Sequence, residues 1–284
     1  MAEVTMETIK ELRALTNAGM MDCKKALIET AGNMEEAIKV LRKRGQAIQV
    51  KRADKEAKEG LVASVACDKC GAVALVEVNC ETDFVAKTDG FKGFVDKVAG
   101  KVVAGDMNAA ETLKDDMDAL VASTGENMKI SRVERFTLQG TGKIEAYIHT
   151  GGKVGVLVEV GCDKPETVTA PAFCEFTRDV ALQIAALAPR FLSGDQVPQA
   201  DIDSELEIKL TAMKELKGKL PPESALVGIK KGMTQKFFSE ICLLDQEFVK
   251  ISKTSIRQHM GNVAKALGDN LVIRRYVRFQ LGQH

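Results

Sequence analysis

The sequence predicts an α+β protein that begins with a small helical domain and continues into a duplicated core. Three observations support this prediction. Apolar residues recur at helical spacing through positions 1–45. A strand followed by an amphipathic helix then occurs twice, and two further apolar stripes interrupt the second occurrence. We therefore expect two related core subdomains with antiparallel sheets, of which the second carries a helical insertion.

Residues 1–45 contain three short apolar stripes at helical spacing, separated by Gly19 and Gly32. Asn33 precedes the third stripe and is a good N-cap residue, and Gly45 is placed to end that helix. Short helices joined by tight turns pack as a compact bundle. The first domain is therefore expected to be a three-helix bundle.

Residues 46–60 are charged and show no helical or strand period, so we expect a linker here. From Lys39 to Lys58 the chain carries eight basic and two acidic residues. Such a run can contact RNA, but it is more often a solvated helix end and tether. Forty basic and forty acidic residues cancel over the whole chain, which argues against a strong field for nucleic acid.

An internal repeat defines the core. The segment LVEVNC at 75–80 returns as LVEVGC at 157–162, and the apolar helix positions Phe91 and Phe94 recur at the same offset as Phe173 and Phe176. The segment GENMKISRVERF at 125–136 matches GDNLVIRRYVRF at 268–279, at a larger offset. Apolar and polar residues alternate in this last segment, as is typical of an antiparallel strand with one buried face.

We assign residues 61–139 to the first core subdomain and residues 140–284 to the second. Because the second offset is larger than the first, the second subdomain must contain an insertion, which lies between Ile184 and Gly268. Two apolar stripes lie within it, separated by the segment GKLPPES, whose Gly and Pro residues stop and turn the chain. We predict a projecting antiparallel helical hairpin at about 198–245.

Asp83 and Phe84 lie in the polar connection between a strand and the next helix. At the offset that relates the two LVEV segments, the second copy has Pro165 and Glu166 in their places. An aromatic residue on such a connection, absent from the sister copy, is a candidate contact residue. The alternative is that Phe84 extends the apolar stripe of the helix by one turn and that Asp83 only caps it. The pattern alone leaves both interpretations open.

Four segments closely resemble the bacterial elongation factor Ts family: LRALTNAGMMDCKKAL, VEVNCETDFVAKTDGF, YIHTGGKVGVLVEV and KKGMTQKFFSEICLLDQEFV. The resemblance covers nearly the whole chain in order. It implies a ubiquitin-associated-like N-terminal domain, two related core subdomains, and a coiled-coil hairpin that projects from the second. This agrees with the repeat and the insertion.

The resemblance also implies a function: guanine nucleotide exchange on elongation factor Tu, a GTPase, without enzymatic activity of its own. The match makes Asp83 and Phe84 a wedge that enters the GTPase domain and disturbs its Mg²⁺ and phosphate site, and His149 would help to seat it. Further matching contact positions are Arg13, Met20, Met21, Lys24, Gly125 and Val249. The adjacent residues Met20 and Met21 cannot both face inward, so one of them should be exposed.

Other chemistry finds little support. Cys67 and Cys70 form one CxxC at an expected hairpin turn, which cannot supply four zinc ligands and does not start a thioredoxin-like helix. With three His residues and no P-loop motif, we expect no metal, nucleotide or other cofactor. No apolar run is long enough for a membrane span and no signal segment is evident, so a cytoplasmic protein is expected.

Three alternative functions stay open. The main one is an adaptor-type binding module without exchange activity, and the others are a thiol oxidoreductase and an RNA-binding protein that uses residues 39–58. The helical hairpin could also support self-association or a 2:2 complex with the GTPase.

Overall fold

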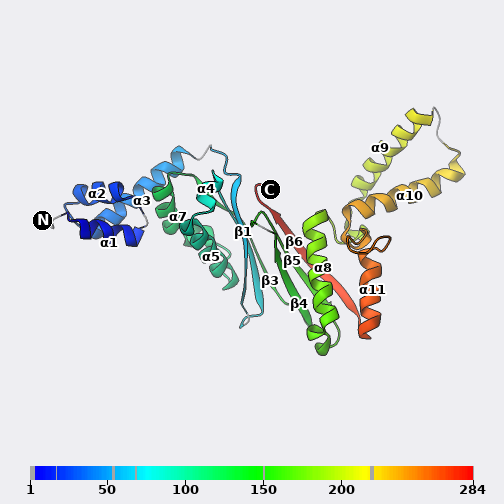
Figure 1. The fold of residues 1–284 in the computed structure, drawn as a ribbon. Helices are drawn as coiled ribbons and strands as arrows, with labels where there is room; N and C mark the ends of the chain where they lie inside the picture. The colour runs from blue at the N-terminus through cyan, green and yellow to red at the C-terminus, as the bar shows by residue number, and fades with distance from the viewer. Residues whose placement is uncertain are drawn as a thin grey trace. The chain divides into compact units, whose positions relative to one another are not determined.

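The computed structural model describes residues 4–16, 18–52, 55–67, 69–149, 151–217 and 221–283. It is an α+β protein with two three-stranded sheets, as the sequence predicted (Figure 1). The chain divides into two compact units. The first unit comprises Met1–Thr137, Ile148–Val156 and Phe279–His284, and the second unit comprises Leu138–Tyr147 and Leu157–Arg278.

The first unit begins with three helices, α1 (Met6–Thr16), α2 (Met20–Glu29) and α3 (Met34–Lys51). Their apolar stripes meet in a separate small core, made up of Ile9, Leu12, Ala18, Cys23, Ala26, Leu27, Ala37 and Leu41. Asn33 caps α3 as expected, because its side chain accepts a hydrogen bond from the Glu36 backbone N–H at 3.2 Å.

The prediction that Gly45 ends this helix is wrong, since α3 continues to Lys51. Gly45 instead allows α3 to approach α7 (Lys114–Thr124) closely, because a Cβ atom there would collide with the carbonyl oxygen of Asp118. Part of the segment expected to be a linker is therefore helix packed on the core. Of that segment, residues 53–54 lie outside the described residues.

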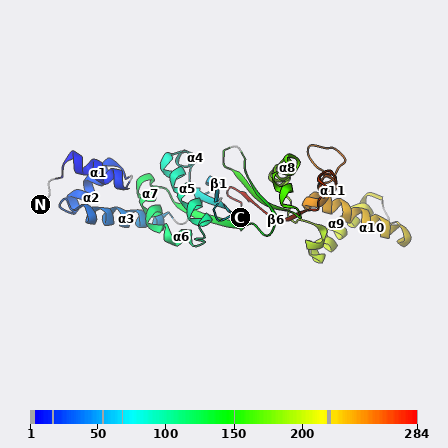
Figure 2. The ribbon, with the colours of Figure 1, turned by 90° about the horizontal axis from the view of Figure 1, so that it is seen from below.

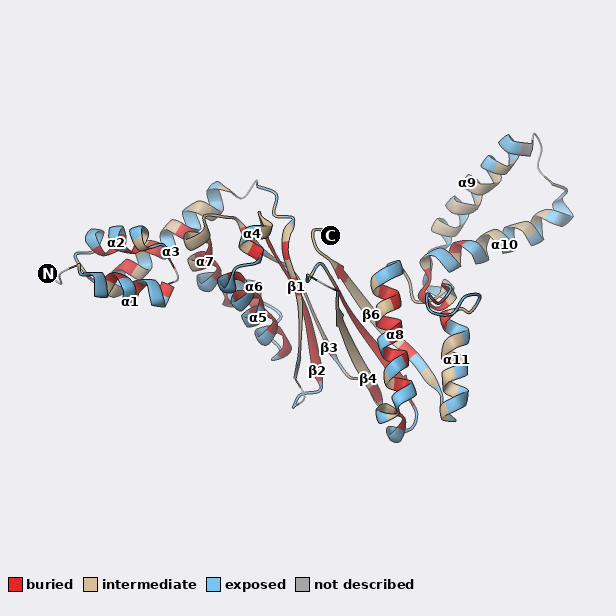
Figure 3. Cartoon of the chain, in the orientation of Figure 1, coloured by how far each residue is buried: buried red, intermediate tan, exposed pale blue. Residues whose placement is uncertain are grey.

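The first sheet has the antiparallel order β1-β2-β3, formed by β1 (Glu59–Cys67), β2 (Ala72–Cys80) and β3 (Met128–Thr137). The central strand β2 is buried along its whole length (Figure 3). The helix α5 (Asp89–Val103) packs on β1 and β2 through Phe91, Phe94, Val98 and Val102, while α4 (Asp83–Ala86), α6 (Ala109–Thr112) and α7 lie beside it (Figure 2).

The second sheet has the order β4-β5-β6, formed by β4 (Gly142–Ile148), β5 (Val154–Cys162) and β6 (Leu271–Gln280). Its connections contain the 3₁₀ turn η1 (Pro165–Thr169) and the helices α8 (Pro171–Leu187) and α11 (Ile256–Leu267). The predicted insertion contains two helices, α9 (Gln199–Lys217) and α10 (Glu223–Ile241), with the 3₁₀ turns η2 (Gly194–Gln196) and η3 (Leu243–Asp245) at its base.

The repeat is visible in atomic detail. Gly60 and Gly142 occupy equivalent positions and both have positive φ, at 138° and 152°, and a Cβ atom at either would collide with a carbonyl oxygen of the facing strand. The fully buried carboxylates Glu77 and Glu159 are also equivalent. Each accepts a hydrogen bond from an arginine Nε of the third strand, Arg132 at 2.7 Å and Arg275 at 2.8 Å.

Candidate partner-binding site

The short helix α4 presents Phe84 to solvent. Thr82 caps α4, with its hydroxyl accepting from the Val85 N–H at 3.4 Å, and Thr88 caps α5 separately, accepting from the Phe91 N–H at 3.3 Å. Two separate N-caps divide the chain into two helices, so Phe84 does not continue the buried stripe of α5. Its side chain is 78% exposed.

Asp83 occupies the first position of α4 rather than the cap. Its carboxylate accepts from the Lys87 ammonium at 2.6 Å across one helical turn, and this hydrogen bond lowers the pKa of Asp83 and raises that of Lys87. Asp83 is half-buried and Lys87 is exposed. The pair therefore lies beside Phe84 at the surface, where a partner can reach both charges.

Two carboxylates hold the connection that leads into α4. Glu126 accepts from the Thr82 backbone N–H at 3.0 Å and from the Thr82 hydroxyl at 2.6 Å. Glu81 accepts two hydrogen bonds from the Arg52 guanidinium, at 2.7 and 2.6 Å, and a third from the Asn127 backbone N–H at 2.7 Å. The guanidinium is the largest reason that the pKa of Glu81 is lowered to about 2.

His149 is exposed at the turn between β4 and β5. Its backbone is fixed by bonds to Val154 and Gly152, and the Gly152 carbonyl accepts from the Val62 N–H of β1 at 2.7 Å. Lys153 of this turn contributes to the lowered pKa of Asp83. The turn and α4, both in the first unit, are therefore close enough for their charges to interact.

The matching residues of the helical bundle, called the bundle patch below, lie on α1 and α2. Arg13 and Lys24 are exposed, Met21 is 63% exposed, and Met20 is half-buried against the bundle core. One methionine of the adjacent pair thus faces out, as the sequence indicated.

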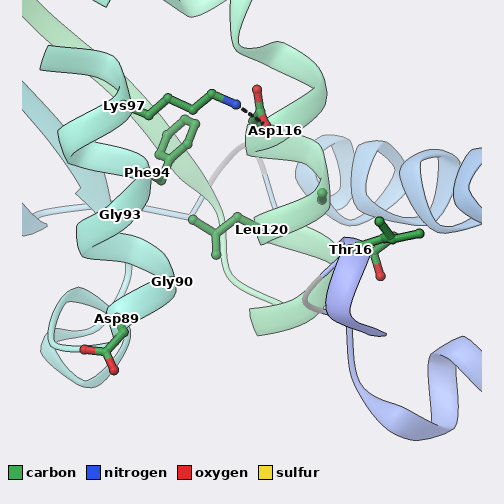
Figure 4. A pocket seen from close by; sticks show the side chains of 10 residues that line it. Thr16, Asp89, Gly90, Gly93, Phe94, Lys97, Asp116 and Leu120 are labelled. Carbon is green, nitrogen blue, oxygen red and sulfur yellow. Dashed lines mark hydrogen bonds and ion pairs between the residues drawn. The ribbon is translucent and has the colours of Figure 1, made fainter. Parts of the chain in front are cut away.

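A cavity of about 290 Å³ lies between α1, α5 and α7 (Figure 4). Leu15, Gly90, Gly93 and Leu120 contribute to its lining, and the Lys97 ammonium pairs with the Asp116 carboxylate at 2.7 Å beside it. A charged pair and glycines do not make a reactive centre. Among the described residues, no group of three or more His, Cys, Asp or Glu side chains could hold a metal ion.

Gly125 and Val249 lie elsewhere. Gly125 ends α7 in the left-handed conformation, with φ of 75°, and leads directly into Glu126. Val249 belongs to the second unit and is 54% exposed. Its backbone N–H donates to the side-chain oxygen of Gln183 at 3.1 Å.

Cys67 and Cys70 flank the β1–β2 turn, both in the reduced thiol state. The Cys70 thiol lies 3.7 Å from the Cys67 carbonyl oxygen. Asp68 of this motif lies outside the described residues. The hairpin setting is the one that the sequence indicated, and it differs from the helix start that thiol oxidoreductases use.

Sequence reasoning did not find Arg52, Glu81, Glu126 or Gln183. These residues form hydrogen bonds that hold the segments carrying the candidate contact residues. One signal was present: the acid at position 126 recurs as Asp269 in the second copy of the repeat. Asp269 accepts from the Lys164 N–H at 3.1 Å, as Glu126 does from Thr82.

Comparison with known proteins decides the family. A family profile described as Elongation factor TS matches residues 81–283. The protein named Elongation factor Ts from Clostridium perfringens strain 13 is 39% identical over 292 residues, which cover 99% of this chain and 93% of the relative. The chain belongs to the elongation factor Ts family. Elongation factor Ts from Trichlorobacter lovleyi is 40% identical over 99% of this chain, and that from Symbiobacterium thermophilum is 40% identical over 100% of this chain; 93% of each relative is covered.

Membership of the elongation factor Ts family places the chain in translation elongation, a part of protein biosynthesis. The profile match begins at Glu81, two residues before α4, and includes the β4–β5 turn and Val249. Within the described ranges, every helix is too short or too polar to cross a membrane.

Proposed function

We propose that this protein is the guanine nucleotide exchange factor of elongation factor Tu and that it performs no chemical step itself. Membership of the elongation factor Ts family implies this role. The observation that supports it best is the 78% exposure of Phe84 on a turn held by buried and charged groups. A protein of this family acts in the cytoplasm, where elongation takes place.

The mechanism requires only differential binding. The factor binds the nucleotide-free GTPase more tightly than the GDP-bound form. Thermodynamic linkage then requires that factor and nucleotide weaken each other's binding by the same ratio. GDP leaves the ternary intermediate faster, and GTP can take its place.

Phe84 acts as the wedge, with Asp83 beside it. Burying a phenylalanine side chain in a partner contributes about 2–3 kcal/mol, which is enough to bias a local rearrangement. The displaced element of the GTPase carries groups or waters around Mg²⁺, whose octahedral coordination tolerates little distortion. Weaker Mg²⁺ binding leaves the charge of the β-phosphate uncompensated, so GDP dissociates.

The other matching residues extend the contact. His149 seats the wedge from the β4–β5 turn, and Gly125 adds backbone contact at the end of α7. The bundle patch of Arg13, Met20, Met21 and Lys24 lies near the phosphate side of the nucleotide, and Val249 adds a contact from the second unit.

The finer assignments of the fold belong to the same proposal. The helices α1 and α2 and the first part of α3 form a ubiquitin-associated-like domain over about residues 1–45, and residues 61–139 and 140–284 form the two core subdomains. The α9–α10 hairpin is a coiled coil, and it is the surface through which the factor self-associates or forms a 2:2 complex.

Release of a fluorescent GDP analogue from elongation factor Tu, measured by stopped flow, tests the function. We expect release to accelerate with factor concentration until it saturates. An adaptor without exchange activity would bind the GTPase, as a pull-down would show, but would leave the release rate at its spontaneous value. That result would reject the proposal.

A further inference from the structure

The connection into α4 and its counterpart in the sister copy are held by different sets of hydrogen bonds. Glu126 and Asp269 do the same job in the two copies, each accepting from a backbone N–H and from a threonine hydroxyl at 2.6 Å. Only the connection of the first copy carries the exposed aromatic residue, because its counterpart, at Glu166, is charged. Both copies therefore use a carboxylate to hold this connection, and in the first copy the connection carries Phe84.

The first copy differs in an arginine that binds its second carboxylate, Glu81. The side chain of Glu81 is 11% exposed and receives both arms of the Arg52 guanidinium. The equivalent acid of the second copy, Asp163, accepts instead from the Asn270 side-chain amide at 2.7 Å, and the described residues there provide no arginine for it. Arg52 therefore reinforces only the copy that carries Phe84.

Arg52 comes from a distant part of the chain. It is the C-cap residue that follows α3, the helix that leads out of the bundle, and 29 positions separate it from Glu81. A planar guanidinium that donates two parallel hydrogen bonds to one carboxylate fixes orientation as well as distance. The bond thus joins the end of α3 to the residue two positions before Asp83.

We propose that the clamp formed by Arg52, Glu81 and Glu126 positions the α4 turn for nucleotide exchange. This inference rests on the proposed function, because it assigns the clamp the task of backing the Phe84 wedge. Phe84 can displace part of the GTPase only if the turn that carries it, α4, does not itself move. On a loosened turn, Phe84 still binds, but its burial is spent on ordering α4 rather than on displacing the GTPase.

The test measures GDP release from elongation factor Tu at saturating factor concentration. Arg52→Ala and Glu126→Gln are expected to lower the saturating rate about tenfold, equivalent to about 1.4 kcal/mol in the barrier, with little change in the half-saturating concentration. Arg52→Lys keeps the charge but loses the fork, so its rate is expected between those of Arg52→Ala and the wild type. This mild variant also serves if Arg52→Ala fails to fold.

Asp269→Asn is the matched control, because it makes the same change as Glu126→Gln in the copy without the wedge. Hydrogen–deuterium exchange of the free protein gives a second readout. The peptide covering residues 82–88 should exchange faster in the clamp variants, while the strands of the first sheet keep their protection. Faster exchange throughout the first unit would mean that the clamp only stabilises the fold, and would overturn the proposal.

Phe84→Ala separates this inference from the proposed function. If Phe84→Ala slows GDP release from elongation factor Tu while the Arg52 and Glu126 variants promote release at the wild-type rate, the wedge stands and the clamp is rejected. If Phe84→Ala itself promotes GDP release at the wild-type rate, the wedge role of Phe84 is wrong. The clamp proposal is then rejected with it.

Discussion

At the scale of single residues, both copies of the core bury a glutamate that is paired with arginine. Glu77 and Glu159 are fully buried, yet each receives several hydrogen bonds, including at least one from an arginine. Removing one partner of a buried pair leaves the other charge uncompensated, which costs far more than the pair contributes when intact. Such residues therefore show large and unequal responses to substitution.

Arg132→Met and Arg275→Met should differ in their effect on stability. Arg132 is the arginine that bonds Glu77, whereas Glu159 keeps Arg274 at 3.1 Å when Arg275 is removed. We expect Arg132→Met to lower the free energy of unfolding by about 3–5 kcal/mol and Arg275→Met by clearly less. Urea unfolding measures both, and equal losses would show that Arg274 does not compensate.

Glu81 should make stability depend on pH. Its pKa of about 2 in the folded protein lies below the ordinary value of 4.5, so its stabilisation is present above about pH 5. That stabilisation is lost as the pH falls through 4.5 toward 2. We expect Glu81→Gln to cost about 1 kcal/mol near neutral pH, a modest value because Arg52 is partly exposed and screened. Urea midpoints of the two proteins should converge as the pH is lowered, and parallel curves would contradict this account.

At the scale of elements, the α8 helix supports the loop that carries Val249. Gln183 is fully buried in α8, and its amide nitrogen donates to the Gln246 side chain at 3.2 Å and to the Glu247 carbonyl at 3.0 Å. Its oxygen accepts from the Val249 N–H. One side chain thus satisfies three polar groups of the loop.

Gln183→Leu should free this loop. Leucine has a similar size but leaves buried polar groups without partners, so we expect a loss of about 2–3 kcal/mol in unfolding free energy. Faster hydrogen exchange of the Val249 amide should accompany it. Lys101→Leu is the matched control, since Lys101 is the equivalent residue of α5 and is exposed, and its effect should be small. Equal effects of the two substitutions would reject the supporting role.

The elements themselves were largely predictable, because periodicity and the repeat report them directly. The offset between the two LVEV segments placed both hairpin strands and the following helices, and Asn33 marked the start of α3. Gly45 misled because a glycine after an apolar stripe resembles a helix end, whereas its reason is the approach of α7 from far along the chain. Contacts such as Arg52–Glu81 depend on tertiary packing, which local pattern does not encode. For Phe84 the sequence left two interpretations open, a buried helix residue or an exposed contact residue. Its 78% exposed side chain rules out the buried one.

At the scale of the whole molecule, the candidate contacts gather in one unit. All of the proposed contact residues except Val249 belong to the first unit, which also contains α3, the clamp and the β4–β5 turn. The second unit contains the α9–α10 hairpin, on which Ile208, Leu216 and Val227 are exposed. In the proposed function, the first unit performs exchange, and the second unit adds contact area and the proposed surface for assembly.

The most direct test compares Phe84→Ala with Glu166→Ala, the same substitution at the equivalent position of the sister copy. Both side chains are exposed, so both variants should fold and unfold as the wild type does. In stopped-flow measurements of GDP release from elongation factor Tu, we expect Phe84→Ala to lower the saturating rate by about tenfold or more, and Glu166→Ala to leave it unchanged. If Phe84→Ala promoted GDP release from elongation factor Tu as fast as the wild type does, the exposed aromatic side chain would not drive exchange.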